Sequence, residues 1–337
     1  AAQPPIDPRV RALLGRGLRW DRLQRGDVRI NAVRIEPRSA PLQLRPLAGA
    51  QGMEGLQTLP QLAQVNGALV AINGGYFNRV RRLPLGALKR DGQWLSGPIL
   101  NRGVAAWNGR ELPQFGRLRL EEWVQSSGGP RLPVVALNSG YVQRGVSRYD
   151  RAWGPAYRAL SGQETGVLVR GGQVVQQFSS AALERGIPLA TGDLLLVGRG
   201  GVTLPWAVGS AVQLQSRSSS ELGNARQVVG GGPLLLQGGR IVLNGAAETF
   251  SAAFLRQGAP RTVLASDGRE IWLLTLEGQR GPGPTLGETA QLLQQLGLRD
   301  ALNLDGGSST GLVLGGSQQV MGRGVAGRVH NGVGLTP

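Results

Sequence analysis

ALNLDGGSSTGLVL, residues 301–314, is the most informative stretch of the sequence. An apolar run delivers the carboxylate of Asp305 onto two glycines, and three consecutive hydroxyl residues follow them. Glycine lets the backbone approach a ligand closely, and hydroxyl groups and backbone amides can hold an anion. The stretch therefore predicts a strand that ends in a binding or catalytic site.

A second segment repeats this design. ALVAINGGYFN, residues 68–78, is an apolar run that ends in Asn73, Gly74 and Gly75. Two strand-like runs that each end in Asn/Asp-Gly-Gly predict two walls of one pocket.

The composition is that of a globular protein with an unusual charge. The chain has 337 residues, of which 41% are hydrophobic and none is cysteine, so it can bury a large core without disulfides. Lysine and arginine number 37 against 21 acidic residues, and Lys89 is the single lysine. Because the guanidinium fork suits phosphate and carboxylate, we expect an anionic sugar-phosphate substrate or glycan as partner.

The sequence also bears on location. It contains no run of about 18 apolar residues, so no transmembrane segment is expected. The chain starts with AAQPP, which fits what remains after cleavage at a small-residue signal-peptidase site. We expect a periplasmic or secreted protein, while the lack of cysteine fits a cytoplasmic protein equally well.

Short apolar runs paired around glycine turns predict β-hairpins at residues 166–178, 233–243 and 261–278, with a looser candidate at 28–47. Helices are expected near 59–67 and over 285–298, where Thr285 and Glu288 have the spacing of a capping box.

Together these elements predict an α+β fold with one large mixed, mostly antiparallel β-sheet and a few flanking helices. We expect residues 1–26 to form an N-terminal extension or a peripheral helix. Residues 27–337 would then form a single domain, with the weakly patterned segment near 117–162 as a candidate insertion.

Five segments, in this order and spacing, resemble the phosphodiester glycosidase family across residues 28–335. They are AINGGYFN (71–78), PLGALKRDG (84–92), VVGGGPLLLQGG (228–239), RTVLASDGR (261–269) and TLGETAQLLQQLGLRDALNLDGGSST (285–310). The resemblance implies hydrolysis of a sugar-1-phosphodiester at the glycosidic bond, as in the family member that removes N-acetylglucosamine to expose mannose 6-phosphate. The chain departs from the family pattern at Leu276-Glu277-Gly278-Gln279-Arg280, where the family often has Asp-Gly-Arg, and in its shorter glycine run after Asp305.

The catalytic candidates are two acids. Asp305 is the first choice for nucleophile or base, and Glu277 is the choice for its partner. Glycosidases usually place two carboxyl groups about 5–5.5 Å apart for retention of configuration, or about 6.5–9.5 Å for inversion. A phosphate monoester is a much better leaving group than a sugar alcohol, so one carboxylate with cations can suffice. The structural alternative for both acids is an ordinary turn residue before glycine.

The substrate-binding candidates combine amides, hydroxyls and arginines. They are Asn73, Gly74, Gly75, Arg261, Asn303, Gly306, Gly307, Ser308, Ser309, Arg328 and Asn331. We expect Asn73 and Asn303 to orient the sugar, the amides of Gly74 and Gly75 to meet an anion, and Arg261, with Arg328 second, to clamp the phosphate.

Metals and nucleic acid are not expected at the site. With His330 as the single histidine and no cysteine, the usual zinc ligand set cannot form. No cofactor is required, although structural calcium or magnesium on Asp and carbonyl oxygens stays open. Nucleic-acid binding is not expected, because the positive charge comes with no basic helix or aromatic platform.

The sequence thus predicts a hydrolase that cleaves a glycosyl phosphodiester, such as an N-acetylglucosamine-1-phosphodiester, in a bacterial envelope polymer or exopolysaccharide. The alternative is a catalytically silent module that binds an anionic glycan in the same pocket. The sequence leaves open the sugar, the stereochemical course and the oligomeric state.

Overall fold

The computed structural model describes residues 6–337, so the opening AAQPP lies outside the described residues. Within 6–337, strands predominate, and the five α-helices are no longer than 10 residues. The predicted α+β class with mostly antiparallel strands and few helices is confirmed, although the strands form several sheets rather than one. In this part of the chain, no helix has the length and apolar character of a membrane span.

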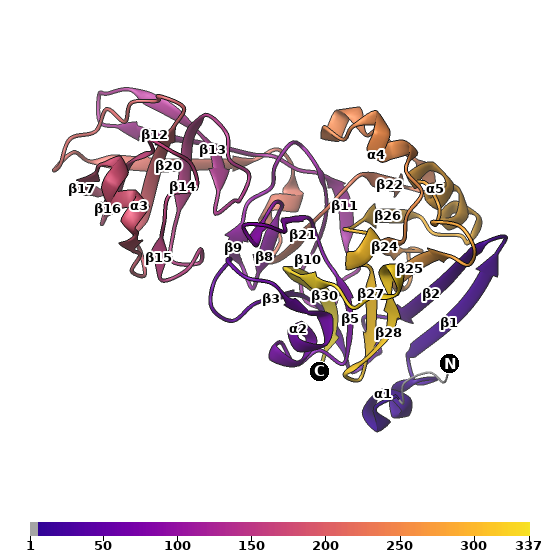
Figure 1. The fold of residues 1–337 in the computed structure, drawn as a ribbon. Coiled ribbons are helices and arrows are strands. Elements are labelled where there is room, and N and C mark those ends of the chain that lie inside the picture. Colours follow the sequence, from indigo (N-terminus) through magenta and orange to yellow (C-terminus); the bar gives the residue numbers. More distant parts are fainter. Residues whose placement is uncertain (1–5) are drawn as a thin grey trace.

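The strand that precedes Asp305 belongs to a seven-stranded antiparallel sheet, at the right of Figure 1. In spatial order its strands are β1 (Leu18–Arg25), β2 (Val28–Ile35), β25 (Ile271–Gly278), β24 (Arg261–Ser266), β26 (Asp300–Asn303), β22 (Leu234–Gln237) and β23 (Arg240–Ile241). The hairpins predicted at 261–278 and 233–243 are β24–β25 and β22–β23.

Helix α5 (Leu286–Gln295) precedes β26 and has the predicted capping box, in which Thr285 and Glu288 each bond the other's backbone. Its apolar side chains Leu286, Ala290 and Leu293 share a core with Ala301 of β26. This packing holds the helix against the sheet and thereby fixes where the chain leaves β26.

A five-stranded antiparallel sheet ends at the other Gly-Gly motif. In order it contains β28 (Ser317–Met321), β27 (Gly311–Leu314), β5 (Val70–Asn73), β30 (Asn331–Thr336) and β3 (Gln43–Ala48). Helix α2 (Leu59–Val65) packs on it, with Leu62 against Ala71 and Val313 in one core. The hairpin predicted at 28–47 is wrong, because β2 pairs with β1 and β25 while β3 pairs with β30.

A second five-stranded sheet has the order β11 (Gln114–Arg117), β10 (Gly103–Trp107), β21 (Gln227–Gly230), β8 (Leu88–Arg90) and β9 (Gln93–Ser96). Two short pairs, β6 (Phe77–Asn78) with β7 (Leu83–Pro84) and β4 (Gln57–Thr58) with β29 (Arg328–Val329), and the helix α4 (Ala252–Arg256) complete this part of the molecule.

The segment between β11 and β21 forms a separate lobe, at the left of Figure 1. Its seven-stranded sheet has the order β17 (Gln173–Phe178), β16 (Thr165–Arg170), β19 (Leu194–Arg199), β14 (Gly145–Tyr149), β13 (Arg131–Leu137), β12 (Leu120–Ser126) and β20 (Val212–Ser218). The pair β15 (Ala156–Tyr157) and β18 (Ile187–Pro188) and the helix α3 (Ser180–Arg185) belong to the same segment. Because β11 and β21 both pair with β10, the inserted segment runs over residues 120–218, well beyond the expected 117–162.

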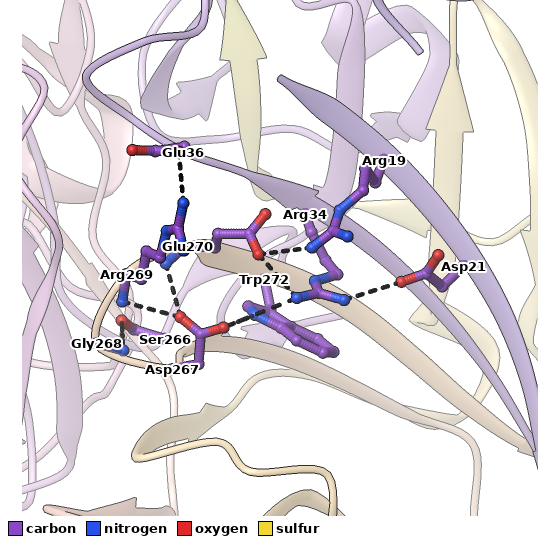
Figure 2. A network of polar contacts seen from close by, with 10 residues as sticks. All are labelled: Arg19, Asp21, Arg34, Glu36, Ser266, Asp267, Gly268, Arg269, Glu270 and Trp272. Carbon is purple, nitrogen blue, oxygen red and sulfur yellow. Dashed lines mark hydrogen bonds and ion pairs between the residues drawn. The ribbon is translucent and has the colours of Figure 1, made fainter. Parts of the chain in front are cut away.

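The first described residues form α1 (Pro8–Leu13) and then β1, so residues 1–26 contain an edge strand as well as a helix. Figure 2 shows the ion network that fastens this edge to the turn of the β24–β25 hairpin. Arg34 donates to Glu270 at 2.7 Å and to Asp21 at 3.2 Å, and Arg19 donates to Glu270 at 2.8 Å. Asp267 Oδ2 lies 3.9 Å from Arg34 Nη2. Every arginine in this network therefore has a carboxylate partner.

Candidate active site

The two Asn/Asp-Gly-Gly segments meet where β5 and β26 end. The side-chain amide of Asn73 donates to the backbone oxygen of Asp305 at 2.6 Å, and the Asp305 N–H donates to the Gly74 oxygen at 2.9 Å. The preceding Leu304 N–H donates to the Thr262 oxygen on β24 at 2.8 Å. Backbone from both sheets thus holds Asp305, and the two motifs lie side by side.

A cavity of about 240 Å³ opens at Asp305. It is lined by Arg79, Phe254, Gln257, Ala259, Arg261, Asp305, Gly306, Gly307, Ser308 and Arg323. Three guanidinium groups, one carboxylate and one hydroxyl therefore share a small space. A site with more positive than negative charge suits a ligand that carries a phosphate or carboxylate group.

The Asp305 side chain is half-buried, and this burial raises its pKa from 3.8 to about 6. Hydrogen bonds from Ser309 and the Gly306 backbone, together with the charge of Arg79, limit the rise. A carboxyl group with a pKa near 6 is ionised at neutral pH, yet it takes up a proton readily. This property suits a general base, and the ionised form can also act as a nucleophile.

Arg261 begins β24 and is only 2% exposed. Its Nε donates to the Pro284 oxygen at 3.0 Å, and its Nη2 donates to the Gln257 oxygen. No carboxylate lies within ion-pair distance of it in residues 6–337, and burial lowers its pKa. A buried cation without a counter-charge is costly, and an anion in the cavity would supply the missing partner.

Two lining arginines, Arg79 and Arg323, were not among the residues predicted from the sequence. Arg79 donates to the hydroxyls of Ser308 and Ser309 at 3.1 and 3.0 Å. Arg323 lies against Gly307, where an added Cβ would meet its Nε at 3.4 Å. Arg79 directly follows the NGGYFN segment, and this adjacency was the available signal. Arg323 stands in a GRG triplet with no comparable signal.

Gly306 and Gly307 shape the cavity through the backbone. A Cβ on Gly306 would lie 2.4 Å from the Pro260 oxygen, so no larger residue fits there without movement. Gly307 has a φ of +63° and its N–H donates to the same oxygen at 2.9 Å. The turn that carries Ser308 and Ser309 past Asp305 therefore requires both glycines.

Gly74 and Gly75 do not offer their amides to a ligand, in contrast to the prediction. The Gly74 N–H donates to the backbone oxygen of Asn331 at 2.9 Å, and the Gly75 N–H donates to Asn331 Oδ1 at 2.8 Å. A Cβ on Gly74 would lie 2.1 Å from that Oδ1. The two glycines are needed for close packing against Asn331. All three residues hold the motif in place and do not line the cavity.

Asn73 likewise supports Asp305 rather than reaching into the cavity. Besides its bond to Asp305, its Oδ1 accepts from the Thr262 hydroxyl at 2.7 Å and from the Gly311 N–H at 3.2 Å. The side chain is 1% exposed, so it has little surface left for a sugar.

Asn303, two residues before Asp305, is hydrogen-bonded to Tyr76. The Asn303 amide donates to Tyr76 Oη at 3.2 Å and to the Gly232 oxygen at 3.1 Å, to which the Tyr76 hydroxyl also donates at 2.6 Å. Burial and the charge of Asp305 raise the pKa of Tyr76, so the phenol stays protonated. The Tyr76 ring packs against Phe254, a lining residue, at 6.3 Å between ring centroids.

Three further residues lie outside the cavity lining. Glu277 is half-buried near the end of β25, where burial raises its pKa and the charge of Arg29 opposes the rise. Arg328 is exposed on β29, opposite Thr58. His330 is buried, with Nε2 2.6 Å from the Met53 oxygen and Nδ1 3.1 Å from the Asn331 amide; burial lowers its pKa to about 4 and keeps the ring neutral.

The structure groups no three or more His, Cys, Asp or Glu side chains where they could hold a metal ion, as far as residues 6–337 are concerned. A structural calcium or magnesium ion held largely by carbonyl oxygens stays an untested expectation.

More than half of the chain matches a known protein family. Residues 131–336 match the phosphodiester glycosidase family. A protein from Synechocystis of unassigned function is 41% identical, with a TM-score of 0.89, over 95% of this chain and 62% of its own. A Burkholderia pseudomallei protein whose name suggests export is 20% identical, with a TM-score of 0.74, over 92% of this chain and 74% of its own.

The catalytic domain of zebrafish N-acetylglucosamine-1-phosphodiester alpha-N-acetylglucosaminidase, auto-inhibited by its pro-peptide, is 16% identical, with a TM-score of 0.49, over 95% of this chain and 82% of that one. No curated protein matches the sequence. The chain spans about three fifths of the length of the Synechocystis protein.

Proposed function

The chain belongs to the phosphodiester glycosidase family, and we propose that it hydrolyses the glycosidic bond of a sugar-1-phosphodiester. The observation that supports this most directly is the cavity at Asp305, in which one carboxylate of raised pKa faces three arginines. A substrate with a phosphate beside a sugar C1 matches that arrangement of charge.

In this proposal Asp305 acts on the water or on the sugar. As general base, ionised Asp305 takes a proton from water while the water oxygen attacks C1 and the C1–O bond breaks, with the electron pair leaving on the phosphate monoester. As nucleophile, Asp305 attacks C1 itself while the C1–O bond breaks and the phosphate monoester leaves; water then attacks C1 of the glycosyl ester, which releases the sugar, the Asp305 carboxylate and a proton to solvent. The first course gives the inverted sugar and the second the retained one.

The arginines stabilise the leaving phosphate. When the C1–O bond breaks, the phosphodiester monoanion becomes a monoester with additional negative charge. Arg261 lacks a carboxylate partner, and Arg79 is held by Ser308 and Ser309 beside Asp305, so both can meet this charge as it develops. Since the leaving group is weakly basic, a second carboxylic acid is not needed to protonate it.

The natural substrate in this proposal is a phosphodiester-linked glycan of the bacterial envelope or an exopolysaccharide, and the protein acts after export to the periplasm or the medium. The net charge of +16 supports an anionic polymer as substrate.

The test is turnover of N-acetylglucosamine-1-phosphate esters by the wild type, by Asp305→Asn and by Asp300→Asn, a matched change at the start of β26 and outside the cavity lining. We expect Asp305→Asn to lower kcat by about 10²–10⁴-fold, the range of general-base catalysis, and Asp300→Asn to keep most of the activity. NMR of the sugar anomer that forms first distinguishes the two roles of Asp305, since a general base gives the inverted anomer and a nucleophile gives the retained one. Retained activity in Asp305→Asn contradicts the assigned role. If the wild type binds such esters but turns over none, the chain is a glycan-binding module instead.

A further inference from the structure

A second, larger hollow lies next to the Asp305 cavity. Its volume is about 890 Å³, and the β6–β7 hairpin and the inserted lobe form its walls. From the hairpin come residues 80–83, and from the lobe come residues 153–156, 158–160 and 185–188. The lobe thus contributes most of a surface that the reaction at Asp305 does not use.

The hollow is strongly basic. Arg81, Arg82, Arg158 and Arg185 line it, against the single acid Glu54. Glu54 pairs with Arg82 at 3.3 Å. In residues 6–337 the other three arginines have no carboxylate within 4.0 Å, and Arg81 instead donates to the carbonyl of Leu160. Three guanidinium groups without a counter-charge suit a phosphate-bearing ligand.

One loop joins the hollow to the Asp305 cavity. Arg79 lines the cavity, whereas Val80 and Arg81, the next two residues, line the hollow. The Asn78 side chain accepts from the N–H groups of Val80 at 3.0 Å and Arg81 at 2.9 Å, so the turn is fixed. Val80 is 91% exposed between the two sites, so a bound chain can pass over it from one site to the other.

We propose that the hollow binds a further phosphate group of the same substrate molecule, so that the protein acts on a chain of repeated sugar-phosphate units. This inference rests on the proposed function at Asp305. Arg81, Arg158 and Arg185 hold the next phosphodiester, and the exposed Pro155 and Pro188 offer apolar surface to the intervening sugar. The inserted lobe accordingly selects polymers over single-unit esters.

The test compares binding of two probes in the Asp305→Asn background, where turnover does not interfere. The probes are a tetramer of N-acetylglucosamine joined through 1-phosphodiesters and the methyl ester of N-acetylglucosamine-1-phosphate. We expect the tetramer to bind at least tenfold more tightly than the monomer. Arg158→Ala with Arg185→Ala should reduce that advantage by roughly tenfold, because two exposed charge contacts, each weak by itself, are lost together.

The control removes the same charge elsewhere. Arg240 and Arg299 are exposed and lie close together, because the Gly239 N–H donates to the Arg299 oxygen. The double variant Arg240→Ala with Arg299→Ala should leave the tetramer's advantage within about twofold. Equal losses in both double variants, or a tetramer that binds no better than the monomer, overturn the inference. Failure of the proposed function looks different, because the wild type then turns over neither probe while the effect of the arginines on tetramer binding persists.

Discussion

The two ends of the β24–β25 hairpin differ in whether their arginine has a carboxylate partner. At the turn, Arg34 is paired with Asp21 and Glu270, and Asp267 lies 3.9 Å away (Figure 2). At the open end, Arg261 is more deeply buried, yet its donors reach only backbone carbonyls. Charge that is neutralised within the protein belongs to the fold, whereas buried charge without a partner indicates a ligand.

The largest expected effect is on activity at the open end. Arg261→Met removes a phosphate contact, and we expect kcat/KM on an N-acetylglucosamine-1-phosphate ester to fall by about 10²–10³-fold, as for loss of one charge-stabilising donor. Because an unpaired buried cation disappears, the free energy of unfolding should change by less than about 1 kcal/mol. Steady-state kinetics and urea unfolding measure the two effects. A large loss of stability with activity intact would assign Arg261 to the fold.

The matching change at the turn should do the reverse. Arg34→Met leaves the half-buried Asp267 without a cation and Glu270 with the exposed Arg19 alone, so we expect the free energy of unfolding to fall by about 1–3 kcal/mol. The value of kcat/KM should stay within about twofold, because the network lies at the other end of the hairpin. Arg16→Met, at an exposed arginine, is the control for loss of charge alone. If Arg34→Met abolished turnover in a folded protein, the contrast between the ends would fail.

This contrast also marks what the sequence could predict. Hairpins and capped helices were predictable because their signals are local, as at Asp267-Gly268 and at Thr285 with Glu288. The hairpin predicted at 28–47 failed because an apolar run does not specify its partner strand, and β3 pairs with the distant β30. The expected insertion ended at residue 162, whereas the lobe extends to residue 218. The sequence does not show this boundary, because the lobe and the main domain both consist of short apolar strands.

At the site, the motif around Asp305 could be located, but the direction of each side chain could not. The sequence treats Asn73, Gly74 and Gly75 as ligand-binding, although the fold turns their polar groups toward Asp305 and Asn331. Arg79 reaches the cavity across 229 residues of sequence separation from Ser308, which only the tertiary structure reveals.

The carboxylates at the two ends should respond to pH with opposite signs. Burial raises the Asp305 pKa from 3.8 to about 6, so the folded state binds this proton more tightly than the unfolded chain. Its unfavourable contribution therefore grows as pH rises through 4–6, and Asp305→Asn should raise the free energy of unfolding by about 2 kcal/mol at pH 8 and by little at pH 4.

Asp267 is the matched carboxylate at the turn. Burial opposes ionisation there, but hydrogen bonds from the backbone of Glu270 and Arg269 prevail and lower its pKa below 3.8. Its contribution is present above that pH and is lost as pH falls, so Asp267→Asn should destabilise the protein at pH 8. Urea unfolding of both variants from about pH 2 to pH 8 checks the signs, because the Asp267 contribution is lost only below about pH 4. Destabilisation by both variants at pH 8 would contradict the functional interpretation of Asp305.

The smallest expected effect concerns Glu277, which tests whether the open end needs a second acid. Glu277 lies on β25, outside the cavity lining, and burial raises its pKa without bringing it to Asp305. We expect Glu277→Gln to change kcat/KM by less than about threefold, an energy below 1 kcal/mol, and to leave the rise of activity with pH near 6 in place, because that rise follows ionisation of Asp305. A pH–rate profile of wild type and variant decides the point. A loss of about 100-fold or more, together with a missing limb in the profile, would identify Glu277 as the catalytic partner and show that one carboxylate among arginines is not sufficient.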